Sequence, residues 1–315
     1  MFQNKTPPIK PLNVENVFSA GLRIYRDNFK SYFGVSIRAN LWFLLPFLAL
    51  IPVPLFFMYG QPENLLFLLL IPIWLLLFLY CSAKSIVNSA IIARLVFGEL
   101  VNQPETVREA RRIMAPKIWA FFLALFLLFL MEMGIWLCFS MVIGIIAGII
   151  TAIMEDPAQQ IVGILAFLGL IVIILFPIFL NFYLRLLIRF FIIDIPLAVE
   201  ENITATQTIG RSWELTKGYV GRIFLILIVG VLITIPIGII QQIIATEIKG
   251  ILLTTVPTPS RDPSFQILSF LIRYIIGLLG NLLLLPFRQA IKAVVYYDLR
   301  THREGIGLEL RKREI

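Results

Sequence analysis

The sequence has little of what enzymes and metal sites are usually built from. Its 315 residues include one histidine and two cysteines, and only 15% are charged. Cys81 and Cys138 stand in separate apolar runs with no histidine near either, so neither a zinc site nor a disulfide is expected. A soluble domain carries about 25% charged residues, so a soluble fold is also excluded.

Catalytic motifs are missing as well. The sequence contains no Gly-rich phosphate loop, no Ser-His-Asp set and no HExxH pattern. Catalysis needs a nucleophile or base beside a positioned partner, and the single histidine, His302, stands in a charged tail. We therefore expect no enzyme activity, no cofactor and no metal.

Long apolar stretches are abundant. Hydrophobic residues make up 59% of the chain, and the mean hydropathy is +0.91. A membrane helix needs about 20 apolar residues. Six stretches are long enough, which predicts an all-α integral membrane protein with six transmembrane helices, at about 34–58, 65–84, 118–150, 160–184, 223–245 and 266–287.

Basic residues indicate the orientation. Among 27 Lys and Arg, only Lys249, Arg261 and Arg273 lie in or near the three hairpin loops. Because cytoplasmic loops hold the Lys and Arg excess, both termini are predicted to face the cytoplasm. The net charge of +8 then suits anionic lipid. Nucleic acid is not expected as a partner, because no basic soluble module is present.

One layout occurs three times. Apolar runs end in an acid at Glu99, Asp194 and Asp298, and each closes a pair of long hydrophobic segments. This pattern predicts three parallel repeats, at about 13–100, 101–197 and 198–305, within one membrane domain covering 13–305. Residues 1–12 are expected to be a disordered tail, and 306–315 a charged one.

Each repeat begins with a short amphipathic segment. Residues 13–30, 106–119 and 204–219 place apolar side chains at helical spacing, with basic residues elsewhere around the helix. Such segments are expected to lie in the headgroup plane. Each repeat is therefore an interfacial helix followed by a transmembrane hairpin, and Trp213, Lys217 and Tyr219 are predicted to lie at the interface.

Two motifs resemble a known bacterial family. They are AVVYYDLRTHREG at 293–305 and RSWELTKG at 211–218, the second followed by an apolar run. They resemble the membrane domain attached to some glycerophosphoryl diester phosphodiesterases, together with its stand-alone relatives, and the likeness covers about 13–305. It implies a multi-pass fold without an activity, since the chemistry of fused members lies in a soluble barrel. It also implies a bacterial plasma membrane, with another internal bacterial membrane as the alternative.

Polar residues inside the apolar stretches are candidates for function. They are Glu132, Asn181, Arg185, Arg273 and Asn281. An ionisable group at mid-membrane costs on the order of 2.5–3.5 kcal/mol and should find a partner. Glu132 and Arg273 are the pair we expect, either as a structural link or as a substrate or proton site.

Charges recur where the helix pairs end. They are Arg94 with Glu99, Arg189 with Asp194, and Asp298 with Arg300 or Arg303. Residues five apart lie about 140° apart around a regular helix, so these need not be mutual partners. They are expected to fix each helix end to the next amphipathic helix.

Two functions fit this sequence. The first is a non-catalytic membrane protein that organises lipid, or another membrane protein, at the cytoplasmic face. The alternative is a transporter of a small or amphiphilic solute through a central polar cavity. A wet cavity reaching Glu132, Asn181 and Asn281 would favour transport, and an apolar bundle axis would favour the first function.

Overall fold

The structure is a computed structural model that describes residues 13–49, 66–153, 156–255 and 263–305. These residues form helices joined by short turns, with no strand among them. Both expected tails lie outside the described residues, as do the end of the first predicted crossing and most of the hairpin connections.

The first part of the chain forms three helices. α1 (Val14–Asp27) is amphipathic, and α2 (Phe29–Leu48) follows it after Asn28. α4 (Leu66–Leu100) returns along α2 and packs against it, and we call this pair the first hairpin. With 35 residues, α4 is longer than the roughly 20 residues that a bilayer requires, so it extends beyond the hydrocarbon layer.

The second part repeats this order. After α5 (Val107–Met114), the 3-10 turn η1 (Ala115–Lys117) leads directly into the long α6 (Ile118–Ile153). The return helix is divided by the short π-helical turn η2 (Ile171–Leu175), just before Pro177. Proline has no N–H to donate, and a π turn is one way in which a helix absorbs the lost bond. We call α6 and its return the second hairpin. The return consists of α7 (Pro157–Leu170), η2 and α8 (Phe176–Arg189).

The third part begins with two short helices, α9 (Asp194–Val199) and α10 (Ala205–Thr216). α11 (Val220–Thr255) and α12 (Pro263–Glu304) then pack together as the third hairpin. α12 is the longest described helix, with 42 residues.

Two of the amphipathic helices start in the same way. Thr106 before α5 and Thr204 before α10 each form a capping box, in which the backbone N–H of the threonine donates to Glu109 at 2.8 Å or to Gln207 at 2.9 Å. These reciprocal bonds satisfy backbone donors that the first turn leaves free. Before each box stands an asparagine with positive φ, Asn102 at 57° and Asn202 at 58°.

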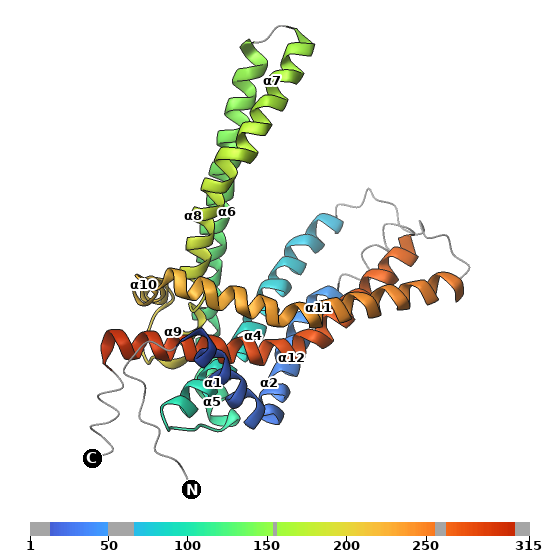
Figure 1. The fold of residues 1–315 in the computed structure, drawn as a ribbon. Coiled ribbons are helices and arrows are strands. Elements are labelled where there is room, and N and C mark those ends of the chain that lie inside the picture. Colours follow the sequence, from blue (N-terminus) through green and yellow to red (C-terminus); the bar gives the residue numbers. More distant parts are fainter. Residues whose placement is uncertain (1–12, 50–65, 154–155, 256–262, 306–315) are drawn as a thin grey trace.

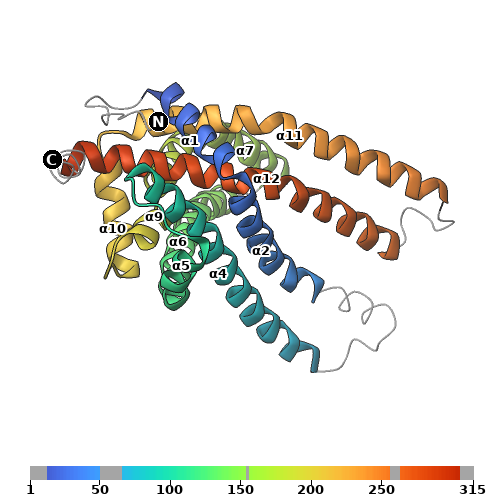
Figure 2. The same cartoon turned by 90° about the horizontal axis from the view of Figure 1, so that it is seen from below.

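The hairpins leave a common base in different directions (Figures 1 and 2). The base consists of α1, α5, α9 and α10, with the C-terminal parts of α4 and α12 and the first turns of α6 and α11. The first and third hairpins pack on each other, whereas the second stands apart above the base. The described residues therefore do not form one closed bundle of hairpins. An apolar side chain gains little by leaving lipid for another helix, so packing along whole hairpins has a weak driving force.

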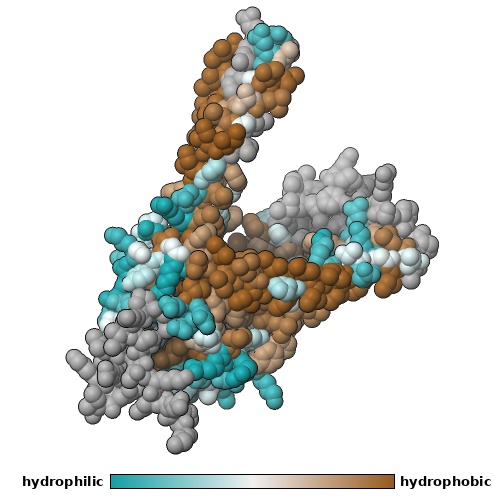
Figure 3. Space-filling model, viewed as in Figure 1, coloured by the Kyte–Doolittle hydropathy of each residue, from teal (hydrophilic) through white to brown (hydrophobic). Residues whose placement is uncertain are grey.

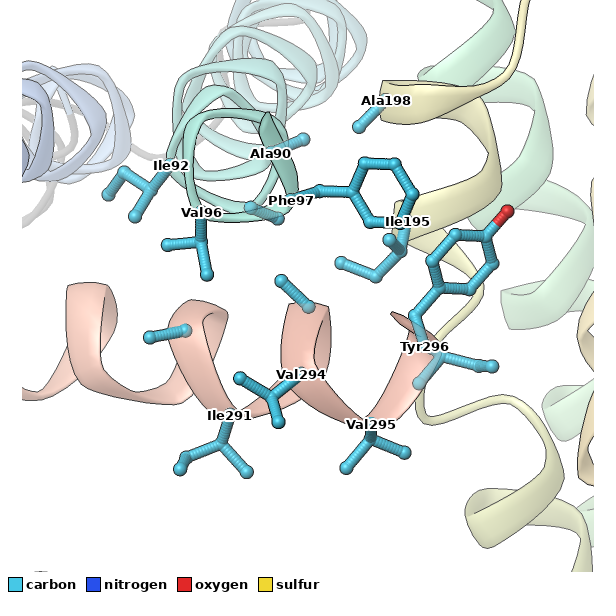
Figure 4. Close-up of a cluster of buried hydrophobic side chains, with 14 of the residues drawn as sticks. Ala90, Ile92, Val96, Phe97, Ile195, Ala198, Ile291, Val294, Val295 and Tyr296 are labelled. Atoms are coloured by element: carbon cyan, nitrogen blue, oxygen red, sulfur yellow. The ribbon is translucent and has the colours of Figure 1, made fainter. Parts of the chain in front are cut away.

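The hydrophobic core lies in the base. Side chains of α4, α9 and α12 meet there, and Figure 4 shows Val96 and Phe97 of α4 near Ile195, Val294 and Tyr296. The apolar faces of the amphipathic helices are buried in the same core: Val17 of α1, Met114 of α5 and Leu215 of α10 are at most 1% exposed. The apolar faces of these helices therefore pack inside the protein, and their opposite faces form part of its surface.

The hairpins expose apolar surface instead. On the face drawn in Figure 3, hydrophobic residues cover them and hydrophilic residues gather over the base. Among the described residues, five helical segments are long and apolar enough to cross a membrane: Pro72–Leu100, Val107–Ile153, Ile173–Val199, Val220–Thr254 and Leu268–Glu304. The chain is thus an all-helical membrane protein. α2 is not among the five, and its predicted crossing continues into residues 50–58, outside the described part.

Stability should depend on the base more than on the hairpins. Ile195→Ala removes a side chain with 0% exposure, and we expect the free energy of unfolding to fall by about 2–5 kcal/mol. The control Ile178→Ala changes a residue that is 64% exposed on α8 and should cost little. Denaturant unfolding in mild detergent, followed by circular dichroism, measures both. Equal losses would contradict a core confined to the base.

Candidate functional site

The centre of the base is the short helix α9, which is buried along its length. Its first residue, Asp194, is 6% exposed. The Asp194 carboxylate accepts hydrogen bonds from Lys292 Nζ at 3.0 Å and from Gln289 Nε2 at 3.1 Å, both on α12. A buried carboxylate is costly unless it is paired and hydrogen-bonded, so these two donors allow Asp194 to lie in the core.

The other end of α9 is held by two cations. Lys117 Nζ donates to the carbonyl oxygens of Leu197 at 3.0 Å and Glu200 at 2.9 Å. Arg94 Nη1 donates to the carbonyl oxygen of Ala198 at 2.8 Å. The last carbonyls of a helix have no partner within it and carry partial negative charge. α9 is therefore bound by cations from α4, η1 and α12.

A second polar cluster joins the segment after α9 to α10 and α12. Arg211 Nε donates to Glu200 Oε1 at 2.9 Å, and Arg211 also pairs with Glu304. The Tyr296 hydroxyl donates to the same Glu200 carboxylate. Burial alone would lower the pKa of Arg211, but the hydrogen bond and charge of Glu200, with the charge of Glu304, raise it above its ordinary value. Arg211 thus stays protonated between its two acids.

The predicted helix-end charges are used in several ways. Arg94 binds Glu105, just before α5, through two hydrogen bonds of 2.7 and 2.5 Å. Arg189 lies over the Trp213 ring of α10 at 3.8 Å. Both contacts tie a helix end to the next amphipathic segment, as the sequence suggested. Glu99 is exposed and forms no ion pair within the described part of the chain.

The third predicted repeat end differs from the other two. Asp298 is 3% exposed and pairs with Arg222 Nη1 of α11 at 2.7 Å. The expected Arg300 instead pairs with Glu304, one turn further along α12, at 2.8 Å. α12 is the last described helix, and the charge at its end therefore binds the start of α11.

The predicted interfacial residues also contribute to the base. Trp213 is 40% exposed and carries Arg189 on its ring. The Arg303 guanidinium lies 6.0 Å from the Tyr219 ring and donates to the carbonyl oxygen of Lys217. These contacts fix α10 and the start of α11 to neighbouring helices.

Glu132 and Arg273 are not brought together. Glu132 lies on α6, in the hairpin that stands apart, and it has no hydrogen bond or ion pair among the described residues. Arg273 Nη2 of α12 donates instead to Gln242 Oε1 of α11 at 2.6 Å. Asn181 and Arg185 are exposed on α8. The expected pair was wrong because depth along a helix does not tell which hairpins are neighbours.

Asn281 belongs to a line of polar contacts that we call the polar seam: Ser36, Asn40, Asn281 and Arg288. Asn281 Nδ2 donates to Asn40 Oδ1 at 2.7 Å, and Arg288 donates to Asn281. The Ser36 hydroxyl donates to the carbonyl oxygen of Leu282 at 2.9 Å. The seam holds α2 against α12. Sequence reasoning missed Ser36 and Asn40, although two polar residues one turn apart near an apolar stretch were a usable signal.

A cavity of about 530 Å³ lies beside the polar seam, between α2 and α12. Phe43, Arg273, Tyr274 and Asn281 are among its lining residues. It therefore contains two of the predicted polar residues, while Glu132 and Asn181 lie elsewhere. Within the described ranges, no group of three or more His, Cys, Asp or Glu residues is placed to hold a metal ion.

Comparison with protein-family models, with curated proteins and with solved structures finds no match to this chain. What is shown is the class, an all-helical membrane protein with a polar, ion-paired base. Function must be inferred from the contacts described above.

The α9 anchor gives a direct test. Asp194→Ala would leave Lys292 and Gln289 without their acceptor, and we expect a loss of roughly 3 kcal/mol in stability. This is the low end for a broken buried pair, because the Lys292 side chain is 21% exposed. In the control Asp27→Ala, the lost partner Arg26 is 80% exposed, so the change should stay within about 1 kcal/mol. Urea unfolding in detergent micelles separates the two, and equal values would contradict the anchor.

Proposed function

We propose that this chain is a non-catalytic, multi-pass membrane protein that gathers anionic lipid, or a partner protein, at the cytoplasmic face. One observation carries the proposal. Some cations of the base are paired inside the protein, whereas another set has no acidic partner among the described residues.

The paired set is structural. Arg94, Arg211, Arg222 and Lys292 each bind a carboxylate, and Lys117 binds backbone carbonyls. Their charges are matched within the protein, so they attract little from outside.

The second set, which we call the outer cations, has no hydrogen bond or ion pair among the described residues. Its members lie on α1, α2 and α5, and their side chains are exposed or partly exposed: Arg23, Lys30, Arg38, Arg108, Arg111 and Arg112. They stand where the apolar helices leave the base. Each Lys or Arg near an anionic membrane surface contributes about 1 kcal/mol of attraction, which supports anionic lipid as the material gathered.

The topology belongs to the same proposal. We propose six crossings arranged as three like-oriented repeats, with both termini cytoplasmic, in a bacterial plasma membrane. The three hairpins, the matching capping boxes at Thr106 and Thr204, and the matching asparagines at 102 and 202 support this arrangement. Kinship with the glycerophosphoryl diester phosphodiesterase membrane domains is part of the proposal too, supported by the two sequence motifs.

Site-directed labelling tests the topology. Gly60→Cys, Glu155→Cys and Ser260→Cys each place a thiol in one hairpin connection, in a background that lacks Cys81 and Cys138. All three should react with an impermeant thiol reagent added outside intact cells. Tags at the two chain ends should become accessible only after the cells are opened. Tags on opposite faces, or a connection that reacts only from inside, would contradict the six-crossing arrangement.

Lipid enrichment tests the function. In vesicles of mixed phosphatidylglycerol and phosphatidylcholine, energy transfer between labelled protein and labelled lipid should show excess phosphatidylglycerol around the protein. Changing all six outer cations to Gln should remove most of this excess. High salt should weaken it as well, since the Debye length falls from about 10 Å at 0.1 M to about 3 Å at 1 M. Lys249→Gln, on the other side of the proposed membrane, is the control.

Transport remains a second candidate because of the 530 Å³ cavity that contains Arg273 and Asn281. The same vesicles decide between the two functions. Flux of an amphiphilic anion that Arg273→Gln abolishes, with lipid enrichment absent, would favour transport. Enrichment that depends on the outer cations, without such flux, supports the lipid-gathering role.

A further inference from the structure

A basic groove separates the first hairpin from the start of the second. It has a volume of about 270 Å³ and lies between α2, α4 and the α5–η1–α6 segment. We call it the headgroup groove and define it by Arg38, Trp42, Lys84, Asn88, Arg111 and Ile118. Three separate parts of the sequence contribute to it, so it exists only in the folded chain.

Three cations converge in this groove. Arg38 comes from α2, Lys84 from α4 and Arg111 from α5, and the lining includes no acidic residue. None of the three has a hydrogen bond or ion pair among the described residues. Lys84 lies 5.7 Å from the Trp42 ring and 5.6 Å from the Tyr80 ring, which places its ammonium beside aromatic faces. Gathering like charges is unfavourable unless an anion compensates them.

Apart from Asn88, the rest of the lining is apolar. It consists of Trp42, Val87, Ile91, Ala115 and Ile118. A free inorganic anion would gain nothing from this part of the surface. A phospholipid would satisfy both parts, with its phosphate among the cations and its acyl chains along α2 and α6.

We propose that the headgroup groove binds the phosphodiester headgroup of one anionic phospholipid. This rests on the proposed lipid-gathering role and makes it specific, because it names a built site that combines the outer cations Arg38 and Arg111 with Lys84. Arginine guanidinium groups present paired N–H donors that match phosphate oxygens, and Lys84 adds a compact charge. A lipid seated there would join the first hairpin to the second, and the described parts of these hairpins contact each other near the base.

Native mass spectrometry of the full chain in mild detergent tests the site, with phosphatidylglycerol as the probe. We expect one tightly retained lipid. Arg38→Gln, Lys84→Gln and Arg111→Gln should each weaken its binding about fivefold, and together on the order of 100-fold. The matched control, Arg23→Gln with Arg108→Gln and Arg112→Gln, removes equal charge outside the groove and should retain the lipid.

Two further measurements keep the site testable if the triple groove variant fails to fold. Ala115→Phe fills the groove without changing charge and should displace the lipid, because Ala115 lines it. Inorganic phosphate and glycerol phosphate should compete poorly, since neither uses the apolar wall. Equal weakening in the two triple variants, unchanged binding in Ala115→Phe, or full competition by inorganic phosphate would overturn the groove. If vesicle enrichment still depends on the six outer cations in that case, the wider function stands.

Discussion

The structure depends on one constraint, which is that a buried helix of six residues must have its charged and polar ends satisfied. α9 has a carboxylate at one end and, at the other, backbone carbonyls that have no partner within the helix. Both ends are buried. Lys292, Lys117 and Arg94 meet these groups from three separate helical elements. Removing any one partner leaves a desolvated polar group, so the three attachments are not independent. α9 therefore joins the second hairpin to the first and third, which also pack on each other.

This constraint accounts for the open shape. Water drives apolar side chains together in the base, and the core formed by α4, α9 and α12 gains fully from it. In lipid that drive disappears, and only close packing or polar contacts hold helices side by side. The first and third hairpins have such contacts in the polar seam of Asn40 and Asn281, whereas Glu132 of the second hairpin has none among the described residues. The second hairpin accordingly meets its neighbours near the base.

The sequence allowed an all-helical membrane protein to be predicted, because long apolar runs are local features. It also marked Arg94 and Arg189 as charges at helix ends, without identifying their contacts with Glu105 and Trp213. The capping boxes at Thr106 and Thr204 were equally readable. α9 was not, since the five apolar residues that follow Asp194 look like the end of a crossing and only tertiary contacts bury them. The Asn40–Asn281 bond joins residues 241 positions apart, and the Glu132–Arg273 error has the same origin. The depth of a residue in the membrane can be estimated from a sequence, but the residues that lie beside it on other helices cannot.

The charge balance makes a similar point about function. The chain has 27 Lys and Arg against 19 Asp and Glu, and the excess alone indicates only a cytoplasmic face. The fold divides these cations, because those that enter the core must be matched by acids or carbonyls, as Arg211 and Lys292 are. The outer cations are left on α1, α2 and α5, beside the emerging apolar helices. Cations beside the emerging apolar helices lie close to the phosphate layer of a membrane. This position favours lipid over a soluble partner as the substance gathered.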